Sequence, residues 1–135
     1  MLVSVVIPTY NRLPILQQCL RALEAQLPLD PGDDFEVVLV DDGSTDGTVE
    51  WTQQEAAELP HVRLICQEHG GPAIGRNLGV DHANGEVIIF IDSDLVVVPD
   101  FLQHHLRSLR QAWQRDGDRL CFTYGAVINT HNFES

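Results

Sequence analysis

The residues best suited to chemistry are two aspartates separated by one serine, Asp92-Ser93-Asp94, which follow the apolar run Val87-Ile88-Ile89-Phe90-Ile91. Residues i and i+2 of a strand point to the same side, about 7 Å apart along the chain. Two carboxylates this close repel each other unless a cation lies nearby. A hard divalent ion, Mg²⁺ or Mn²⁺, fits such oxygen ligands, and substrate phosphates usually complete its coordination. The pattern favours a metal–nucleotide site, although acidic pairs also cap helices and line turns.

The charge of the chain restricts its partners. Its 135 residues carry a net charge of −12, with 44% hydrophobic and 21% charged residues, which is typical of one globular domain. Nucleic acid needs a basic surface, so we expect no nucleic-acid partner. All the cationic residues are arginine, and the absence of lysine excludes a P-loop lysine or a Schiff-base lysine. Any phosphate ligand should therefore enter together with a metal ion.

The cysteines and the first residues give an expectation for the cellular compartment. Cys19, Cys66 and Cys121 are odd in number, have no C-x-x-C spacing and lie in apolar patterns, which predicts buried free thiols in a reducing environment. No basic segment precedes the short first apolar run, and no run approaches the ~20 residues needed to span a bilayer. We expect a cytoplasmic location, and association with the inner face of the membrane stays open.

Short apolar runs alternate with helical patterns along the whole chain. Runs rich in Val and Ile predict strands over residues 3–7, 35–40, 62–66, 87–91 and 120–128. Helices are predicted over about 14–25, 48–59, 72–84 and 99–117. Strands that are apolar throughout belong to a parallel sheet covered on both faces, and strand–helix alternation gives right-handed crossovers. The predicted fold is α/β, a doubly wound, mostly parallel sheet with helices on both faces, in one domain over residues 1–135.

Polar and glycine-rich residues gather where the predicted strands end. In sheets of this kind, ligands bind beyond the carboxyl ends of the strands. The clusters in question are Pro8-Thr9-Tyr10-Asn11, Asp41-Asp42-Gly43-Ser44, His69-Gly70-Gly71-Pro72 and Asp92-Ser93-Asp94. We therefore expect one edge of the sheet to carry the binding site.

Four motifs occur in a fixed order between residues 3 and 102. They are Val5-Val6-Ile7-Pro8-Thr9-Tyr10-Asn11, Val40-Asp41-Asp42-Gly43-Ser44-Thr45-Asp46, Gly71-Pro72-Ala73-Ile74-Gly75-Arg76-Asn77-Leu78-Gly79 and Phe90-Ile91-Asp92-Ser93-Asp94. In this order they resemble the nucleotide-sugar-binding half of family 2 glycosyltransferases of the GT-A, Rossmann-like fold. The resemblance implies inverting, metal-dependent transfer of a sugar from a nucleotide diphosphate sugar, a UDP-sugar first, to a hydroxyl of a glycan, lipid or small-molecule acceptor.

The resemblance also implies roles for single residues. Asp94 would bind the divalent ion, Mn²⁺ or Mg²⁺, directly, and Asp92 would contact the ribose or reach the metal through water. Asp42, with Asp41 beside it, would fix the edge of the base. The metal ligands implied are Asp94 and Asp92, and the nucleotide-binding residues implied are Pro8, Thr9, Tyr10, Asn11, Asp41, Asp42, Arg76, Asp92 and Ser93.

Structural interpretations of the same residues stay open. Residues 8–11 also suit a turn before the first helix, and Asp41 or Asp42 also suits a turn while Ser44 caps the second helix. Arg76 could contact nucleotide oxygens, hold the acidic residues of the site, or lie on the surface. His69 borders the expected site, whereas His104 and His105 are expected on a solvated helix face.

No residue of the chain is assigned as the catalytic base. Inverting transfer needs a base that takes a proton from the acceptor hydroxyl. In the family that the chain resembles, this carboxylate lies in an acceptor-binding half, well downstream of the two aspartates. The acids that follow Asp94 here are Asp100, Asp116, Asp118 and Glu134, and none is assigned the role. We expect a donor half that lacks its acceptor half, with an uncovered flank open to self-association.

Two other interpretations remain. The chain could be a catalytically incomplete α/β module that assembles with another chain. It could instead belong to a sugar-nucleotidyltransferase-like domain, which would need a glycine-rich, basic phosphate loop after the first strand. The segment Pro8-Thr9-Tyr10-Asn11-Arg12 does not supply such a loop.

Overall fold

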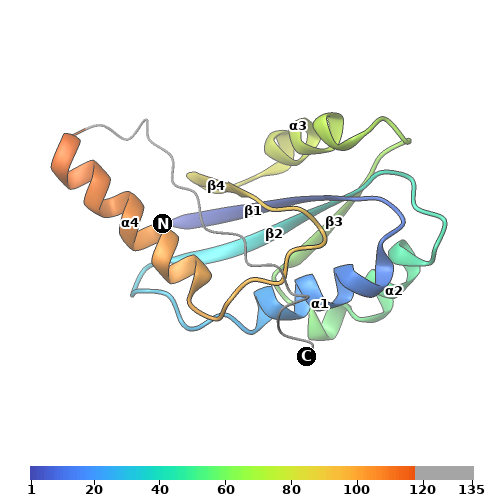
Figure 1. Ribbon diagram of the computed structural model, residues 1–135, viewed down its shortest axis with the longest axis horizontal. Helices are drawn as coiled ribbons and strands as arrows, with labels where there is room; N and C mark the ends of the chain where they lie inside the picture. The colour runs from blue at the N-terminus through green and yellow to red at the C-terminus, as the bar shows by residue number, and fades with distance from the viewer. Residues whose placement is uncertain (118–135) are drawn as a thin grey trace, which may run out of the picture.

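A parallel sheet of four strands forms the centre of residues 1–117, which are the residues that the computed structural model describes (Figure 1). In spatial order the strands are β3 (Val62–Cys66), β2 (Asp34–Asp41), β1 (Leu2–Thr9) and β4 (Val87–Phe90). Every neighbouring pair is parallel. The predicted α/β class is confirmed, and the strand expected over 120–128 lies outside the described residues.

A helix follows each strand along the described chain, as the alternating pattern predicts. They are α1 (Leu13–Glu24), α2 (Thr48–Gln54), α3 (Pro72–His82) and α4 (Phe101–Asp116), with a 3₁₀ turn, η1 (Ala56–Glu58). The prediction of one helix over 48–59 is wrong at its end. The chain tightens into η1 after α2, and this turn carries Leu59 into the core just before Pro60.

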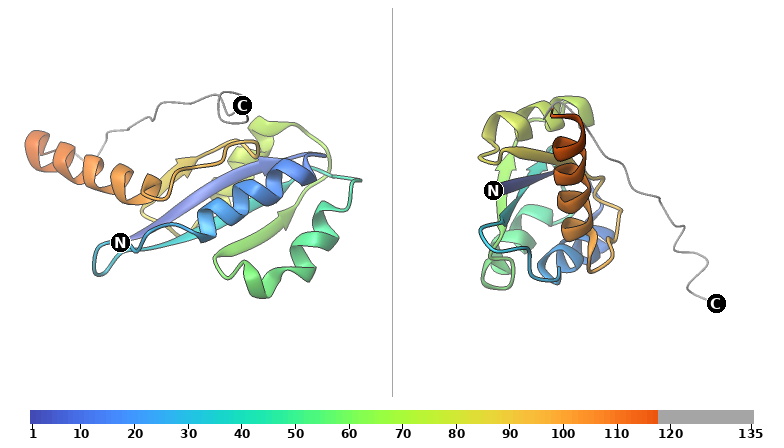
Figure 2. Two further views of the ribbon diagram at one scale, coloured as in Figure 1. Left: turned by 60° about the horizontal axis from the view of Figure 1, so that its bottom comes forward. Right: turned by 90° about the vertical axis from the view of Figure 1, so that its left-hand side faces the viewer.

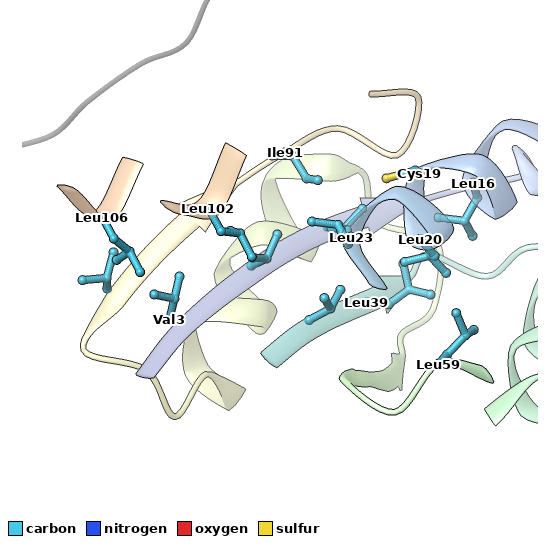
Figure 3. Packing of buried hydrophobic residues seen from close by; sticks show 14 of the residues in the cluster. Val3, Leu16, Cys19, Leu20, Leu23, Leu39, Leu59, Ile91, Leu102 and Leu106 are labelled. Carbon is cyan, nitrogen blue, oxygen red and sulfur yellow. The ribbon is translucent and has the colours of Figure 1, made fainter. Parts of the chain in front are cut away.

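The larger core lies between one face of the sheet and helices α1 and α4. Helix α1 contributes a buried stripe at helical spacing, Leu16, Cys19, Leu20 and Leu23, which packs on β1 and β2 (Figure 3). Leu102 and Leu106 of α4 extend the same cluster. The opposite face is covered by α3, whose Leu78 packs against a smaller cluster of Val6, Val38 and Val40. The right-hand view of Figure 2 shows α1 and α3 on opposite sides of the strands, so helices cover both faces.

Helix α3 lies unusually close to the sheet because it contains Gly79. A Cβ atom at this position would lie 2.3 Å from Cγ1 of Val6, which is far inside van der Waals contact. Only glycine therefore permits this approach. The close packing fixes the height of α3 above the carboxyl end of β1 and so positions Arg76, on the same helix.

Burial differs between the inner and the outer strands. β1 is buried from Val3 onward and β2 from Val37 onward, whereas β3 and β4 are only partly covered and Phe90 is half exposed. The expectation of full coverage therefore holds for the two central strands alone. The prediction that Cys66 is buried is wrong, because it lies at the exposed end of the outer strand β3.

His105 also differs from its prediction of a solvated position. It is buried, and its ring lies edge-on to Phe101 with centroids 4.6 Å apart. Positions 102, 105 and 109 fall on one helical face, so His105 shares the apolar stripe of α4. Burial lowers the pKa of His105, and His104 lowers it further. In the stretch 1–117, no helix is both long enough and apolar enough to cross a membrane.

Candidate functional site

The polar loops at the carboxyl end of the sheet enclose a cleft of about 390 Å³. Eight of its lining residues belong to the predicted site: Pro8, Thr9, Tyr10, Asp42, Arg76, Asp92, Ser93 and Asp94. Arg12 and Pro72 also line it and were not predicted. Asn11 and Asp41 were predicted but are not among the lining residues.

The two aspartates of the D-x-D motif lie in a turn rather than on a strand. β4 ends at Phe90, and the amide of Leu95 donates a hydrogen bond to the carbonyl of Asp92 at 3.1 Å. Both aspartate side chains are exposed, while Ser93 between them is buried. The paired carboxylates expected from the motif are therefore present, but a turn positions them instead of the pleat of a strand.

Each of these carboxylates is paired with one arginine. Arg12 donates from Nη1 to Oδ2 of Asp94 at 3.0 Å, and Arg76 donates from Nη2 to Oδ1 of Asp92 at 3.1 Å. Arg76 therefore holds an acidic residue of the site, which is one of the roles left open by the sequence. Each pair uses one oxygen of its carboxylate, so the second oxygen has no hydrogen-bond partner among residues 1–117.

The buried thiol of Cys19 contacts the backbone of this turn. Its Sγ lies 4.0 Å from the carbonyl oxygen of Asp92 as a weak donor. Burial raises the pKa of Cys19 to about 12, and the charge of Asp94 adds to the effect. The thiol therefore stays protonated and unreactive at neutral pH.

Asp42 is buried and well supplied with hydrogen-bond donors. Its Oδ1 accepts from the amide of Gly70 at 2.8 Å and from Nε2 of Gln67 at 2.6 Å, and its Oδ2 accepts from the amide of Gly71 at 3.1 Å. Nδ1 of His69 lies 2.9 Å from the same Oδ2. Burial by itself would raise the pKa of Asp42, but these donors and His69 outweigh it and lower the pKa below 3.8. Asp42 thus clamps the loop that leads into α3.

Asp41 and Asn11 organise the loops around the cleft. Oδ2 of Asp41 accepts from the amide of Ser44 at 2.9 Å, which matches the turn-stabilising interpretation of Asp41. The amide of Asn11 donates to Oγ of Ser44, and Oδ1 of Asn11 accepts from the amide of Thr45. Ser44 therefore connects the loop after β1 to the loop after β2. It does not cap α2, so the interpretation of Ser44 as a helix cap is wrong.

Asp46 supplies the capping that was expected from Ser44. Its carboxylate accepts from the amide of Thr48, at the start of α2, and from the amide of Leu13, at the start of α1. These donors outweigh burial and lower its pKa. One side chain thus fixes the entry of two helices next to the cleft.

Thr9 and Asp41 each have a buried oxygen without a partner. Oγ1 of Thr9 and Oδ1 of Asp41 make no hydrogen bond within the described part of the chain. The two residues lie opposite each other on β1 and β2, and Thr9 lines the cleft. Buried polar atoms of this kind normally find a partner, so they are consistent with a ligand or water at the base of the cleft.

Tyr10 and His69 provide aromatic surface at the mouth of the cleft. Their rings lie 4.2 Å apart between centroids and are tilted by 30°. Both side chains are exposed. His69 therefore touches Tyr10 and Asp42 together, and its place beside the site agrees with its position in the sequence.

The donor set suits a hard divalent cation that a ligand helps to hold. Asp92 and Asp94 offer free carboxylate oxygens, the ligand type that Mg²⁺ and Mn²⁺ prefer. No cluster of three or more His, Cys, Asp or Glu side chains within residues 1–117 is placed to hold a metal ion. Mg²⁺ commonly binds through one or two carboxylates together with substrate phosphates, and two carboxylates fit this mode.

Comparison with known proteins identifies related sequences. Residues 4–115 match the model of Glycosyl transferase family 2. The chain is 36% identical over 96 residues to the uncharacterized glycosyltransferase YibD of Escherichia coli K12, covering 71% of this chain and 27% of that protein. It is 34% identical over 105 residues to the uncharacterized glycosyltransferase YfnE of Bacillus subtilis 168, covering 78% of this chain and 26% of that protein. The chain therefore spans about a quarter of the length of these relatives.

Solved structures resemble this chain as well. TarS of S. aureus (residues 1–349), crystallised with UDP-GlcNAc, superposes with a TM-score of 0.71 at 32% identity, covering 82% of this chain and 32% of that one. The mannosyltransferase PcManGT of Pyrobaculum calidifontis, in complex with GDP-Man and Mn²⁺, superposes with a TM-score of 0.70 at 33% identity, covering 79% and 32%. Both neighbours were solved with a nucleotide sugar.

Proposed function

Because this chain belongs to glycosyl transferase family 2, we propose that it is the donor-binding part of a metal-dependent inverting glycosyltransferase, with a UDP-sugar as the first candidate donor. The observation that carries the proposal is the cleft itself. It brings the exposed Asp92 and Asp94 together with the buried Asp42 and with Tyr10 at one edge of a parallel sheet. The neighbours solved with UDP-GlcNAc, and with GDP-Man and Mn²⁺, support the same ligand class.

The carboxylates at the exposed side would serve the diphosphate. Asp94 would hold Mn²⁺ or Mg²⁺ through its free oxygen, and Asp92 would contact the ribose or reach the ion through water. The bound ion would neutralise the charge that develops on the departing nucleoside diphosphate. Arg76, already in contact with Asp92, would keep that side chain oriented.

The other side of the cleft would take the base. Tyr10 offers an exposed ring for stacking, and Thr9 offers a hydroxyl without a partner in the described residues. Asp42 would read the edge of the base. Its oxygens already accept from several donors, so contact with a base requires Gln67 or His69 to release its bond to Asp42.

The catalytic base is proposed to lie outside this chain. The three carboxylates among the lining residues have the binding roles given above. A glycan, lipid or small-molecule acceptor and the base that activates it would then be supplied by a further part of the protein. The exposed apolar residues Phe90, Val96 and Val98, on and after the outer strand β4, are a candidate surface for contact with such a part or for self-association. A cytoplasmic site of action, at or near the inner membrane face, is part of the same proposal.

Calorimetric titration tests the donor site. UDP and GDP are titrated into the chain in the presence of Mn²⁺, of Mg²⁺, and of EDTA. We expect UDP to bind with Mn²⁺ or Mg²⁺ and to lose most of its affinity in EDTA. Failure of both nucleotides to bind in Mn²⁺ would contradict the proposal. Tighter binding of GDP than of UDP would mean that the donor is a GDP-sugar, and the proposed site would still stand.

A transfer assay tests the proposed position of the base. The chain is incubated with UDP-sugars, Mn²⁺ and a panel of hydroxyl acceptors, and released UDP is measured. We expect no transfer above the rate of donor hydrolysis. Steady turnover with any acceptor would show that the base lies within these 135 residues.

A further inference from the structure

Arg12 occupies a position in the cleft that the proposed function leaves unexplained. It is the residue just before α1, and its guanidinium reaches Asp94, 82 positions further along the chain. Both residues line the cleft. The contact covers Oδ2 of Asp94, one of the two oxygens of the proposed cation ligand.

The charges of the cleft explain why such a pair forms. The lining residues include three carboxylates, those of Asp42, Asp92 and Asp94, and two guanidinium groups, those of Arg12 and Arg76. Arg12 pairs with Asp94 and Arg76 pairs with Asp92, so each of these neighbouring carboxylates has one positive charge beside it. A divalent cation and a nucleoside diphosphate bring nearly balanced charge, so their arrival lets the arginines change partners without leaving a charge unpaired.

Arg12 and a divalent cation would compete for the negative charge of Asp94, although Arg12 contacts Oδ2 and the cation would bind through the other oxygen. The ion pair is accessible to solvent, with exposed fractions of 56% for the Arg12 side chain and 46% for that of Asp94, so it can break at low cost. A guanidinium that is released here stays next to the cation site on a flexible side chain. Its planar fork matches phosphoryl oxygens, which it can bind through two hydrogen bonds.

We infer that Arg12 has two alternative partners: Asp94, with which it pairs in this structure, and the diphosphate of the nucleotide once a divalent cation occupies Asp94. The inference rests on the proposed function, because it requires a cation and a diphosphate in this cleft. Arg12 then opposes binding of the cation alone and favours binding of the nucleotide with the cation. The two ligands become energetically coupled through one side chain.

The experiment compares Arg12→Gln with the parent chain. Binding of Mn²⁺ alone is followed by electron paramagnetic resonance of the free ion, and binding of UDP in saturating Mn²⁺ is followed by calorimetry. We expect Arg12→Gln to bind Mn²⁺ alone about threefold more tightly, because a competitor is gone. We expect it to bind UDP with Mn²⁺ about tenfold more weakly, because a charged hydrogen-bond donor is gone.

Arg107→Gln is the matched control. Arg107 has the same exposed fraction of 56% and pairs with Asp30 at 2.9 Å, but it lies on α4, outside the lining of the cleft. The affinities of Arg107→Gln for Mn²⁺ alone and for UDP in saturating Mn²⁺ should stay within about twofold of the parent values. Arg12→Lys, which keeps a positive charge without the planar fork, should lie between the parent and Arg12→Gln in UDP affinity, and it carries the test if Arg12→Gln does not fold.

The outcomes separate the inference from the function on which it rests. If the parent chain binds UDP with Mn²⁺ and the Arg12 variants bind it equally well, the inference is wrong and the proposed function stands. A loss of affinity for both ligands would also overturn the inference, because it would mean that Arg12 only shapes the site. If the parent binds neither UDP nor GDP with Mn²⁺, the proposed function and the inference fail together.

Discussion

Carboxylates at the two edges of the sheet have different surroundings. At the amino edge, Asp33 has a side chain only 3% exposed, and it accepts from both terminal nitrogens of Arg110 at 2.5 and 2.6 Å. Glu36, near the same edge, accepts from Ser4, Arg63 and Asn84. At the carboxyl edge, the side chain of Asp92 is 62% exposed and, within the described residues, pairs with one arginine, Arg76.

This difference separates carboxylates that stabilise the fold from those that can bind a ligand. A carboxylate whose oxygens are all satisfied contributes to stability and has little capacity for another partner. A carboxylate with a free oxygen at an exposed edge adds little to stability but can take a ligand. Asp42 combines both features, because it lines the cleft and is nevertheless saturated by donors.

The largest expected effect comes from replacing Asp94 at the carboxyl edge. Asp94→Ala should weaken Mn²⁺-dependent UDP binding by about 100-fold, or about 2.7 kcal/mol, because it removes the proposed cation ligand. Its free energy of unfolding should change by no more than about 0.5 kcal/mol, since the pair with Arg12 is exposed. Calorimetry and urea denaturation measure the two quantities. Asp81→Ala, an exposed acid on α3, is the control and should alter neither. Unchanged UDP affinity in Asp94→Ala would remove Asp94 from the site.

The next largest effect should appear at the amino edge, and it should appear in the free energy of unfolding instead of in UDP affinity. Asp33→Asn removes the nearer counter-charge of Arg110, which keeps a longer contact with Asp30 at 4.0 Å, and should lower the free energy of unfolding by about 2 kcal/mol. UDP affinity should be unchanged. Its neighbour Asp34 is exposed, so Asp34→Asn should have little effect on urea denaturation. A loss of UDP affinity in Asp33→Asn, with the protein folded, would break the distinction between the edges.

Replacement of Arg76 should have an intermediate effect on binding. Arg76→Gln should weaken UDP binding in Mn²⁺ by about tenfold, because Asp92 loses the partner that orients it. The thermal midpoint should stay close to that of the parent, as the pair is exposed. A large drop in the midpoint, with normal UDP affinity, would mean that Arg76 belongs to the fold alone.

The smallest effect should be the pH-dependent one at Asp42. Hydrogen-bond donors outweigh burial and lower the pKa of Asp42 in the folded protein, so its ionised form stabilises the fold above the ordinary carboxyl pKa, and the stabilisation disappears as pH falls through the lowered folded pKa. Asp42→Asn should therefore be less stable at pH 7 by about 1 kcal/mol. The difference from the parent should shrink as pH falls below about 4, when followed by urea denaturation. A difference that stays constant from pH 7 to pH 3 would contradict this account.

The sequence predicts the described part of the fold well because its local patterns are strong. Uniformly apolar strands and amphipathic helices identify every described strand and α-helix. The errors lie at the end of α2, where η1 forms, in the coverage of the outer strands, and in the burial of Cys66 and His105. Burial at those positions depends on which strands lie at the edges and on how a helix is rotated. Neither property is set by the residues next to them in the chain.

The sequence predicts the residues of the site about as well as it predicts the fold. Strand ends identify most of the residues that line the cleft, because parallel strands bring their carboxyl ends to one edge. The sequence did not predict Arg12 because its contact with Asp94 requires β1 and β4 to be neighbours. No local sequence pattern determines the order of the strands in the sheet. A chain with no lysine and two arginines near the predicted loops offered the available clue. The ligand roles of all these residues stay predictions.

The strand order also has a consequence for how the chain folds. β1 is the first strand to be synthesised, yet it becomes one of two inner strands and pairs with β2 on one side and with the much later β4 on the other. The pairing of β1 with β4 requires Val3 to contact Val87, which is far away in the sequence. Contacts of this long sequence separation therefore control the rate of folding. Nascent chains that end before β4 would expose one edge of a strand made almost wholly of apolar residues. We therefore expect slow refolding and a need for protection during synthesis, before Asp92 and Asp94 can reach the loop after β1.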